Sequence, residues 1–510
     1  MPVNSIELSF SETPIFSDTA VVLTVIPCTT DSDAKESSVF QTPALQALAE
    51  KLTAGGGRNL DELLKDEAFT GKHGQTLYLP DSPAGRVLLA GVGSTGVAVH
   101  RLESTLTKSL ARINLKELDL VAAVLPTLDC GLASTALAVS GAFYQHCYRS
   151  KESRSAGPVL HRLTLHAGAT DQSTPEDMNR ILSEVQAMCA GRALTMDLVN
   201  TPSNIKRTAT LVEQAQQLGE NQGLSIEIVD DVAWIEEHMP CFFSVARGSV
   251  ESDPPKWIRV SYRPEGEVKR KIAVVGKAVI FDTGGYQVKP GDFMNTMKAD
   301  MAGSAAVFGA MQAIGELKPQ GLEVQAFFAA TPNMIDSRAM LPDSIVDTTC
   351  GKKVEIRHTD AEGRLTLIDA VALAEREEPE AIVTVATLTG AASRAVGMGM
   401  ALMSRPEHTG WRSAMEAAAH ATGDRVQVLD VMEEDFDNIK SKLDSADIRN
   451  TNRGKSRGAQ TAAAFVMHGA AASMPLVHLD IAGGDMSDDE KATGIAAKCI
   501  VQFLLHHLPA

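Results

Sequence analysis

The stretch GKAVIFDTGGYQVKPGDFMNTMKADM (Gly276–Met301) starts inside an apolar run and ends at a segment rich in small residues. Together with the residues before it, the run KIAVVGKAVIF is typical of a buried β-strand. Lys277 within this strand is costly to bury unless partners compensate for its desolvation. Asp282 follows at the strand's end, and the two glycines after it allow backbone to approach whatever the aspartate binds. The stretch therefore predicts an α/β fold with a polar site at the end of a buried strand.

A second charged segment, HTDAEGRL (His358–Leu365), lies between strand-like KKVEIR and the helical pattern LTLIDAVALAERE. In extended backbone, Asp360, Glu362 and Arg364 point to one side, at the place where α/β sheets bind ligands. A bare surface loop is compatible with the same pattern. The first segment alone is likewise compatible with a buried ion pair and a capping aspartate. Together the segments supply seven charged residues: Lys277, Asp282, Lys289, Asp300, Asp360, Glu362 and Arg364.

Four of these seven residues are carboxylates, and such a concentration of acids favours a site for divalent cations. The sequence has no HExxH motif and no paired Cys/His spacing, so acids rather than imidazoles would hold the metal. The two segments are thus the predicted functional centre of the chain.

The composition limits the remaining possibilities. A length of 510 residues favours two or more domains, and 44% hydrophobic with 22% charged residues is typical of a globular protein. The net charge of −17 argues against general attraction to nucleic acid or anionic membranes. The amino terminus lacks a signal-peptide pattern, and no apolar run reaches membrane-spanning length. Seven cysteines without a CxxC motif suggest reduced thiols, so we expect a cytoplasmic protein that binds neither nucleic acid nor membrane.

The first third of the chain alternates strand-like and helical stretches, which predicts a smaller α/β domain with a mostly parallel sheet. Strands are expected at 21–27, 76–80, 86–93, 118–126 and 162–168, and helices at 60–68 and 102–113. A helix after the polar stretch 169–178 links this domain to a second α/β part. The predicted domains are residues 1–168, a linking helix at 169–199, and a larger domain at 200–510.

Two other patterns have simpler explanations than a binding site. The GVGSTG of Gly91–Gly96 is a GxGxxG after a strand. A dinucleotide site also needs an acid near the end of the next strand, but Glu117 and Asp119 lie where that strand begins. A tight turn that requires glycine is the favoured interpretation. A basic cluster without interleaved aromatic residues indicates a solvated loop face. Its members are Arg149, Lys151, Arg154 and Arg162.

The two charged segments resemble those of the leucyl aminopeptidase (cytosol aminopeptidase) family of two-metal exopeptidases. The family's signature octapeptide reads NTDAEGRL, and its upstream block contains GKG, an FD-[ST]-GG stretch, a second lysine and an ADMGG-like stretch. The resemblance extends to three further motifs: DLVNTPSN (Asp197–Asn204), ATLTGA (Ala386–Ala391) and HLDIAG (His478–Gly483). It covers the whole second part of the chain, whereas over the first part only the architecture is similar. The implied fold has a larger C-terminal catalytic domain with a central mixed sheet.

Carried over by position, the resemblance implies five metal ligands, two catalytic cations and a pocket for the first side chain of the substrate. The ligands would be Lys277, Asp282, Asp300, Asp360 and Glu362, with Asp282 and Glu362 bridging both metals. The cations would be Lys289, which stabilises the oxyanion, and Arg364, which holds a bicarbonate proton shuttle. The pocket would be lined by Met297, Thr387 and Gly390. The resemblance also implies two divalent metal ions per subunit, zinc or manganese, peptide substrates and a homohexamer.

Some positions depart from the family pattern. His358 replaces the usual asparagine, Ala302 replaces a glycine, and Asp485 stands where relatives carry less acidic pocket residues. These changes leave the preferred first residue of the substrate open. Two rival functions also stay open on sequence alone: a DNA-binding or scaffold role, which some bacterial relatives combine with peptidase activity, and a two-metal phosphoesterase.

Overall fold

In the computed structural model, the chain forms two compact units. One consists of Met1–Cys189 with Ala421–Gly423, and the other of Ala190–His420 with Asp424–Ala510. The described residues are 7–10, 23–31, 38–39, 42–56, 59–93, 98–110, 117–123, 137–138, 141–142, 144, 159–166, 175–454 and 456–509. The division falls inside α5 (Pro175–Asn200), where the sequence predicts a linking helix. The domain limits themselves stay a prediction. Residues 94–97 of GVGSTG and the basic residues Arg149, Lys151 and Arg154 lie outside the described residues.

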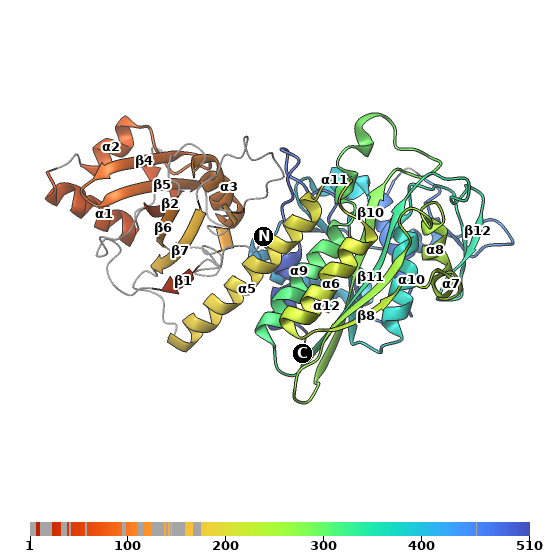
Figure 1. Cartoon of the computed structure of the whole chain (residues 1–510). Coiled ribbons are helices and arrows are strands. Elements are labelled where there is room, and N and C mark those ends of the chain that lie inside the picture. The colour runs from red at the N-terminus through yellow and green to blue at the C-terminus, as the bar shows by residue number, and fades with distance from the viewer. Residues whose placement is uncertain are drawn as a thin grey trace. The chain divides into compact units, whose positions relative to one another are not determined.

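The first unit is built on a mostly parallel sheet (Figure 1). Its strands lie in the order β1 (Glu7–Phe10), β7 (Val159–His166), β6 (Glu117–Ala123), β2 (Leu23–Asp31), β5 (Gly85–Gly93) and β4 (Thr76–Ser82), with β3 (Ser38–Val39) beside β2. Only β4 with β5 and β3 with β2 are antiparallel among these pairs. The helices are α1 (Pro43–Ala54), α2 (Leu60–Asp66) and α3 (Ala98–Leu110). Leu45 of α1 and Leu64 of α2 belong to one buried core with Leu89 of β5, and the predicted α/β architecture is confirmed.

The second unit contains an eight-stranded mixed sheet, as predicted for the larger domain. Its order is β16 (Val426–Val428), β15 (Met400–Ser404), β18 (Leu476–Asp480), β14 (Ala381–Ala386), β10 (Arg270–Asp282), β11 (Leu322–Asn333), β9 (Lys256–Tyr262) and β8 (Ser225–Val229). The four central strands, β18 to β11, run parallel, while β15 and β9 are antiparallel to their inner neighbours. Every residue of β10 from Ile272 to Ile280 is buried. A central strand covered on both faces has no solvent side, which explains its continuous apolar run.

Helices cover both faces of this sheet (Figure 1). One face carries α6 (Thr208–Gln222), α9 (Ala302–Leu317) and α15 (Ala497–Gln502), and the other carries α8 (Pro240–Ala246), α10 (Gly363–Glu375) and α14 (Gly458–Met467). Phe328 of β11 stacks on Phe308 of α9, whereas its neighbour Phe327 packs with Trp257 on the opposite face. The small residues of α9 allow close packing, since a Cβ on Gly309 would lie 2.2 Å from the carbonyl oxygen of Gly191 in α5.

The remaining described elements are a small sheet, four helices and several short turns. A small sheet joins β12 (Ile345–Asp347), β13 (Lys353–Glu355) and β17 (Ile448–Arg449). The other helices are α7 (Val232–His238), α11 (Gly390–Val396), α12 (Thr409–Thr422) and α13 (Glu433–Asn438). Short 3₁₀ turns lie at Gly291–Met294, Met297–Ala299 and Pro406–His408, and a π-helical turn at Phe503–His507 follows α15.

The parallel arrangement brings the carboxyl ends of β10, β11, β14 and β18 to one edge of the large sheet. In register, Asp282 lies beside Asn333, and Ala386 lies beside Asp480. The segments that follow these strands are those that carry the predicted site residues. This edge is therefore where the functional site is built.

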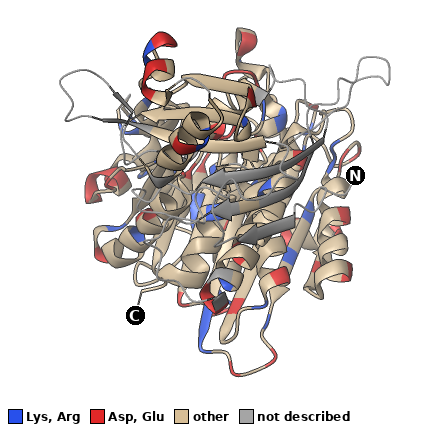
Figure 2. Cartoon of the chain, turned by 90° about the vertical axis from the view of Figure 1, so that its left-hand side faces the viewer, with Lys and Arg blue, Asp and Glu red and all other residues tan. Residues whose placement is uncertain are grey.

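The described surface carries charges of both signs. Figure 2 shows acidic and basic residues interspersed over the described helices and loops. The net charge of the whole chain is −17. Among the described helices, none is long and apolar enough to cross a membrane.

Candidate metal centre

Lys277 lies in the middle of β10 and is only 3% exposed. Its Nζ contacts Asp300 Oδ1 at 2.6 Å and Glu362 Oε1 at 2.9 Å. It also donates a hydrogen bond to the carbonyl oxygen of Thr387 at 2.9 Å. Three oxygen atoms, two of them charged, thus compensate for the desolvation of the lysine. Space for its side chain depends on Gly363, because a Cβ at that position would lie 2.3 Å from Lys277 Cε.

Gly363→Ala is expected to disturb this centre without removing a charged group. The added methyl group would displace Lys277 or the start of α10, and overpacking of this kind costs about 1–3 kcal/mol. We expect zinc affinity to fall about tenfold or more, as measured by calorimetric titration. Gly410→Ala is the matched control, because a Cβ at this helical position in α12 meets no atom within 4 Å. Equal zinc affinities in the two variants would contradict the packing argument.

Asp282 is the last residue of β10, and its carboxylate is held from several directions. Its Oδ1 accepts hydrogen bonds from Gly284 N and from Asn333 Nδ2, each 2.8 Å long. Its Oδ2 contacts Lys289 Nζ at 2.7 Å. The turn after Asp282 requires glycine, because Gly284 and Gly285 have φ values of +88° and +64°. The glycines therefore bring backbone close to the aspartate, as predicted.

The HTDAEGRL segment is not extended, and the sequence-based geometry was wrong here. Asp360 lies in a turn, and Glu362 has helical backbone angles, φ −81° and ψ −37°. The reason is that α10 begins at Gly363, and the carbonyl oxygen of Glu362 already accepts helical hydrogen bonds. His358 supports the turn, since its Nδ1 accepts a hydrogen bond of 3.2 Å from Asp360 N. The charged side chains converge through a turn and a helix start rather than through strand alternation.

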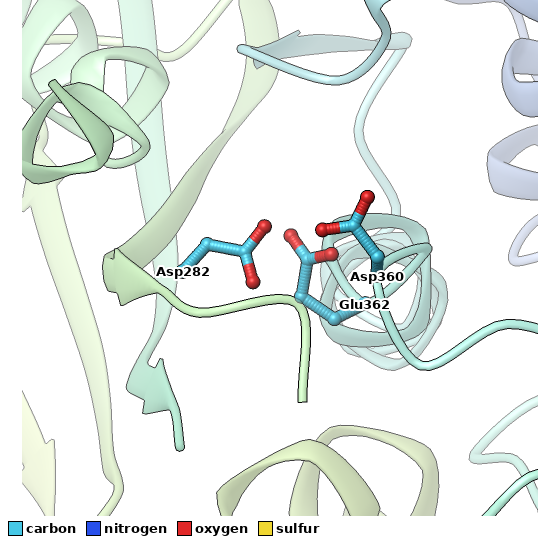
Figure 3. A group of neighbouring side chains, drawn as sticks. All are labelled: Asp282, Asp360 and Glu362. Carbon is cyan, nitrogen blue, oxygen red and sulfur yellow. The ribbon is translucent and has the colours of Figure 1, made fainter. Parts of the chain in front are cut away.

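Three carboxylates, those of Asp282, Asp360 and Glu362, point toward one another (Figure 3). One oxygen atom from each lies within 4.8 Å of the others, a group that could hold a metal ion. Lys289 Nζ lies between two of them, 2.7 Å from Asp282 Oδ2 and 2.5 Å from Asp360 Oδ1. Asp300 and Lys277 adjoin Glu362 on the other side. The structure thus brings together all four predicted carboxylates and both predicted lysines.

The lysines carry the positive charge of the cluster when no cation is bound. Burial lowers the pKa of Lys277, but the neighbouring carboxylates, Asp300 first, more than offset it and raise the pKa above its usual value. The pKa of Lys289 is also raised, because Asp282 and Glu362 outweigh the effect of burial. Burial raises the pKa of Asp300 despite the opposing charge of Lys277. A metal ion that takes the Lys277 amine as a ligand must therefore displace its proton.

Arg364 lies in the first turn of α10 and is 8% exposed. Its Nη1 donates a hydrogen bond of 2.8 Å to the carbonyl oxygen of Asn450. Its Nε is buried and has no hydrogen-bond partner among the described residues. Burial lowers the pKa of Arg364 to about 10, with Glu362 and Asp480 acting in the opposite direction. The guanidinium is thus charged at neutral pH and retains a donor for an anion.

Thr387 is the predicted pocket residue whose side chain contacts the cluster: its Oγ1 donates a hydrogen bond to Asp300 Oδ1 at 2.9 Å. Met297 starts a 3₁₀ turn, and its carbonyl oxygen accepts a hydrogen bond from Asp300 N at 3.2 Å. Gly390 starts α11, three residues beyond Thr387, and is exposed. Thr387 and Met297 thus adjoin Asp300, and the role of all three positions in a substrate pocket stays a prediction.

Sequence analysis missed two asparagines that join the ligand segments. Asn333 donates to Asp282 Oδ1 and, at 3.1 Å, to the carbonyl oxygen of Thr359. Asn450 donates to the carbonyl oxygen of His358 at 2.7 Å and accepts from its N–H at 3.2 Å. Asn333 ends β11, the strand next to β10, and this position at the same sheet edge could have indicated its proximity to Asp282. Asn450 gave no signal, because His358 lies 92 residues away in sequence.

Lys206 is a further missed residue and is only 1% exposed. Its Nζ donates to three carbonyl oxygens: Leu198 O at 2.8 Å, Val199 O at 3.2 Å and Lys298 O at 2.6 Å. Burial, and then the charge of Lys298, lower the pKa of Lys206 to about 7. The residue fastens the carboxyl end of α5 to the segment that carries Met297 and so supports the pocket side of the site.

Comparison with known proteins finds matches in both units. A model of the cytosol aminopeptidase family, catalytic domain, matches residues 193–501, and one of the same family's N-terminal domain matches residues 38–156. The chain belongs to the cytosol aminopeptidase family. Its members are peptidases of the exopeptidase type, so the chain is an aminopeptidase-type hydrolase. The rival DNA-binding or scaffold role is not favoured by these matches.

Individual relatives show how far the similarity extends. The chain is 35% identical to leucine aminopeptidase A1, chloroplastic, of Solanum lycopersicum over 512 residues, which covers 96% of this chain and 86% of the relative. It is 36% identical to a probable cytosol aminopeptidase of Thermosynechococcus vestitus over 490 residues, covering 92% and 95% respectively. The structure of a tomato leucine aminopeptidase mutant superposes with a TM-score of 0.82 at 30% identity, covering 98% of this chain and 96% of the other.

Proposed function

We propose that this aminopeptidase removes the amino-terminal residue of peptides with two divalent metal ions held by Lys277, Asp282, Asp300, Asp360 and Glu362. Lys277 and Asp300 would hold one ion, Asp360 would hold the other, and Asp282 and Glu362 would serve both. The observation that carries the proposal is the convergence of Asp282, Asp360 and Glu362 at the carboxyl edge of the sheet. Zinc and manganese are the proposed metals.

The residues present fit such a pair of cations. Asp300 Oδ2 is buried and has no hydrogen-bond partner among the described residues, so one ligand oxygen is left for a metal. The four carboxylates contact only two lysines, so the cluster has more negative than positive charge. Its negative charge increases by one when Lys277 loses its proton. Oxygen-rich donor sets of this kind suit divalent cations, and an amine ligand is compatible with a borderline ion such as zinc. When bound, two such ions would lower the pKa of a water molecule and polarise the scissile carbonyl.

The two lysines would serve different purposes in this mechanism. Lys277 is nearly inaccessible, with a side-chain exposure of 3%, and can act on substrate only through the metal it holds. Lys289 has a side-chain exposure of 14% and keeps its proton because Asp282 and Glu362 outweigh the effect of burial. Its ammonium group is suited to stabilise the oxyanion that develops when the peptide carbonyl is attacked.

Arg364 would complete the proton pathway without accepting a proton. A guanidinium does not deprotonate in a protein under ordinary conditions, so this residue cannot be the general base. Its buried and unpartnered Nε is suited to hold a small anion, which we propose to be bicarbonate. Arg364 would thereby place a weak base beside the centre and leave its own charge unchanged. Peptide substrates, a homohexamer and a cytoplasmic location complete the proposal and rest on the family resemblance.

The test is a panel of aminoacyl-nitroanilides assayed with Zn²⁺, Mn²⁺, Co²⁺ and Mg²⁺, with a phosphate ester beside them. The proposal expects hydrolysis of the free-amine substrates and none of their N-acetylated counterparts. Turnover of the phosphate ester at a comparable rate would favour the phosphoesterase that the sequence alone left open. Hydrolysis of N-acetylated substrates would contradict an aminopeptidase.

A further inference from the structure

Asp485 carries a carboxyl group to which the proposed mechanism assigns no role. It lies five residues beyond Asp480, the end of β18, and Asp480 pairs in register with Ala386, the residue before Thr387. A tight turn follows the strand, because the carbonyl oxygen of Ile481 accepts hydrogen bonds from Gly484 N at 2.9 Å and Asp485 N at 3.0 Å. The turn thus starts beside the segment that carries Thr387, one of the predicted pocket residues.

The turn that carries Asp485 is held firmly. A Cβ on Gly483 would lie 2.1 Å from Gly397 O, and one on Gly484 would lie 2.4 Å from Ile495 Cδ1, so both residues pack without space for a side chain. The carbonyl oxygen of Asp485 accepts a hydrogen bond from Thr493 N at 3.0 Å. These contacts fix the backbone from which the Asp485 side chain projects.

Among the described residues, no other side chain forms an ion pair or a hydrogen bond with the Asp485 carboxyl group. Burial raises its pKa to about 7, its own N–H and that of Met486 lower it, Asp480 raises it, and the charge of Lys277 lowers it. Nearby Asp480 differs, because its oxygens accept hydrogen bonds from Leu388 N, Thr389 N and Thr389 Oγ1 at 3.1, 3.4 and 2.8 Å.

A partly buried carboxylate without a cation is destabilised, and a cationic group from outside would relieve this. We propose that Asp485 lies in the pocket for the first side chain of the substrate and selects lysine or arginine at the amino terminus. The inference rests on the proposed function, since it assigns a substrate class to the same site. The turn that carries Asp485 follows directly on Asp480, and Asp480 accepts hydrogen bonds from Leu388 N and Thr389 Oγ1, just after Thr387. This placement suits a wall of the pocket.

The test compares lysyl and norleucyl substrates, whose side chains share the same four-carbon stem and differ in the terminal charge. In the metal-loaded wild type, kcat/KM for lysyl amide is expected to exceed that for norleucyl amide by about tenfold or more, the scale of one pocket contact. Asp485→Asn should lower this ratio about tenfold, mainly through the lysyl substrate. Asp485→Ala should likewise raise the leucyl-to-lysyl ratio by up to about tenfold.

Asp488→Asn is the matched control, because Asp488 is exposed just beyond Asp485 and its replacement removes the same charge. If Asp488→Asn leaves the lysyl-to-norleucyl ratio of kcat/KM unchanged, the effect of Asp485→Asn comes from a local contact and not from the net negative charge of the chain. Equal metal content in all variants shows that the centre is intact. A ratio that is the same in wild type and Asp485→Asn, or a wild type that prefers norleucyl substrate, would overturn the inference.

A second readout separates this inference from the proposed function. Calorimetric titration of metal-loaded protein with free L-lysine and free L-norleucine needs no turnover. Tighter binding of L-lysine in wild type, lost in Asp485→Asn and kept in Asp488→Asn, would support the pocket even if no amide were hydrolysed. Absence of hydrolysis with every free-amine substrate would instead contradict the aminopeptidase mechanism. Equal affinities of both amino acids for wild type and Asp485→Asn would overturn the role of Asp485 alone.

Discussion

Lys277→Ala is expected to lose bound metal and peptidase activity together, whereas Lys289→Ala is expected to keep both metal ions and lose mainly kcat. The Lys277 amine lies between Asp300 and Glu362 deep in β10, where it can act only as a ligand or as their counter-ion. Lys289 is more exposed, and we propose that it acts on the transition state, so kcat should fall about 10²–10³-fold with little change in metal content. Elemental analysis and steady-state kinetics on the same preparations measure both effects.

The control for this comparison is Lys271→Ala. Lys271 lies in the same strand and pairs with Glu323 and Glu377, away from the centre, so its loss should leave metal content unchanged. Thermal unfolding must accompany the assay, because removing one partner of a buried ion pair costs about 3–5 kcal/mol. Zinc binding to metal-free wild type and to Lys271→Ala should also release about one proton from the Lys277 amine, since the raised pKa of Lys277 keeps it protonated before binding. Full metal content in Lys277→Ala and depleted metal in Lys289→Ala would reverse the two assignments.

Arg364→Ala is expected to retain both metal ions and to lower kcat about 10²–10⁴-fold, the usual contribution of general acid–base catalysis. The variant removes the buried Nε that we assign to the anion, while the five proposed metal ligands remain. Added bicarbonate should accelerate wild type in carbonate-depleted buffer and have little effect on Arg364→Ala. The measurement is kcat against bicarbonate concentration in buffers from which carbon dioxide has been removed.

Arg364→Lys is the informative companion variant. Lysine keeps the positive charge but lacks the planar set of donors, so it should recover only part of the bicarbonate response. Metal content must match wild type in both variants. Equal stimulation of wild type and Arg364→Ala by bicarbonate would show that Arg364 does not hold the anion.

The main elements of the site were predictable because their signals are local. A lysine inside the apolar run of β10, followed by Asp282 and two glycines, is explained only by partners at that strand and by a turn with positive φ. The alternation of strands and helices likewise indicates which strand ends meet at one edge. These features depend on residues close together in the chain.

What the sequence did not reveal depends on long-range contacts. The helical conformation at Glu362 follows from the start of α10, which overrides the strand-like alternation of its charges. Asn450 and Lys206 act through backbone carbonyls or N–H groups of distant segments, and backbone partners leave no trace in residue identity. The charge state of Lys277 without metal also required the structure, because it depends on how closely Asp300 and Glu362 approach.

The most direct test of the account is the metal content of the active protein. Wild type dialysed against a chelator should lose its aminopeptidase activity in step with its metal, and zinc or manganese should restore activity as occupancy approaches two ions per 54.3-kDa chain. Elemental analysis and hydrolysis of an aminoacyl-nitroanilide are measured on each sample. Full activity in a verified metal-free preparation would contradict the two-metal mechanism.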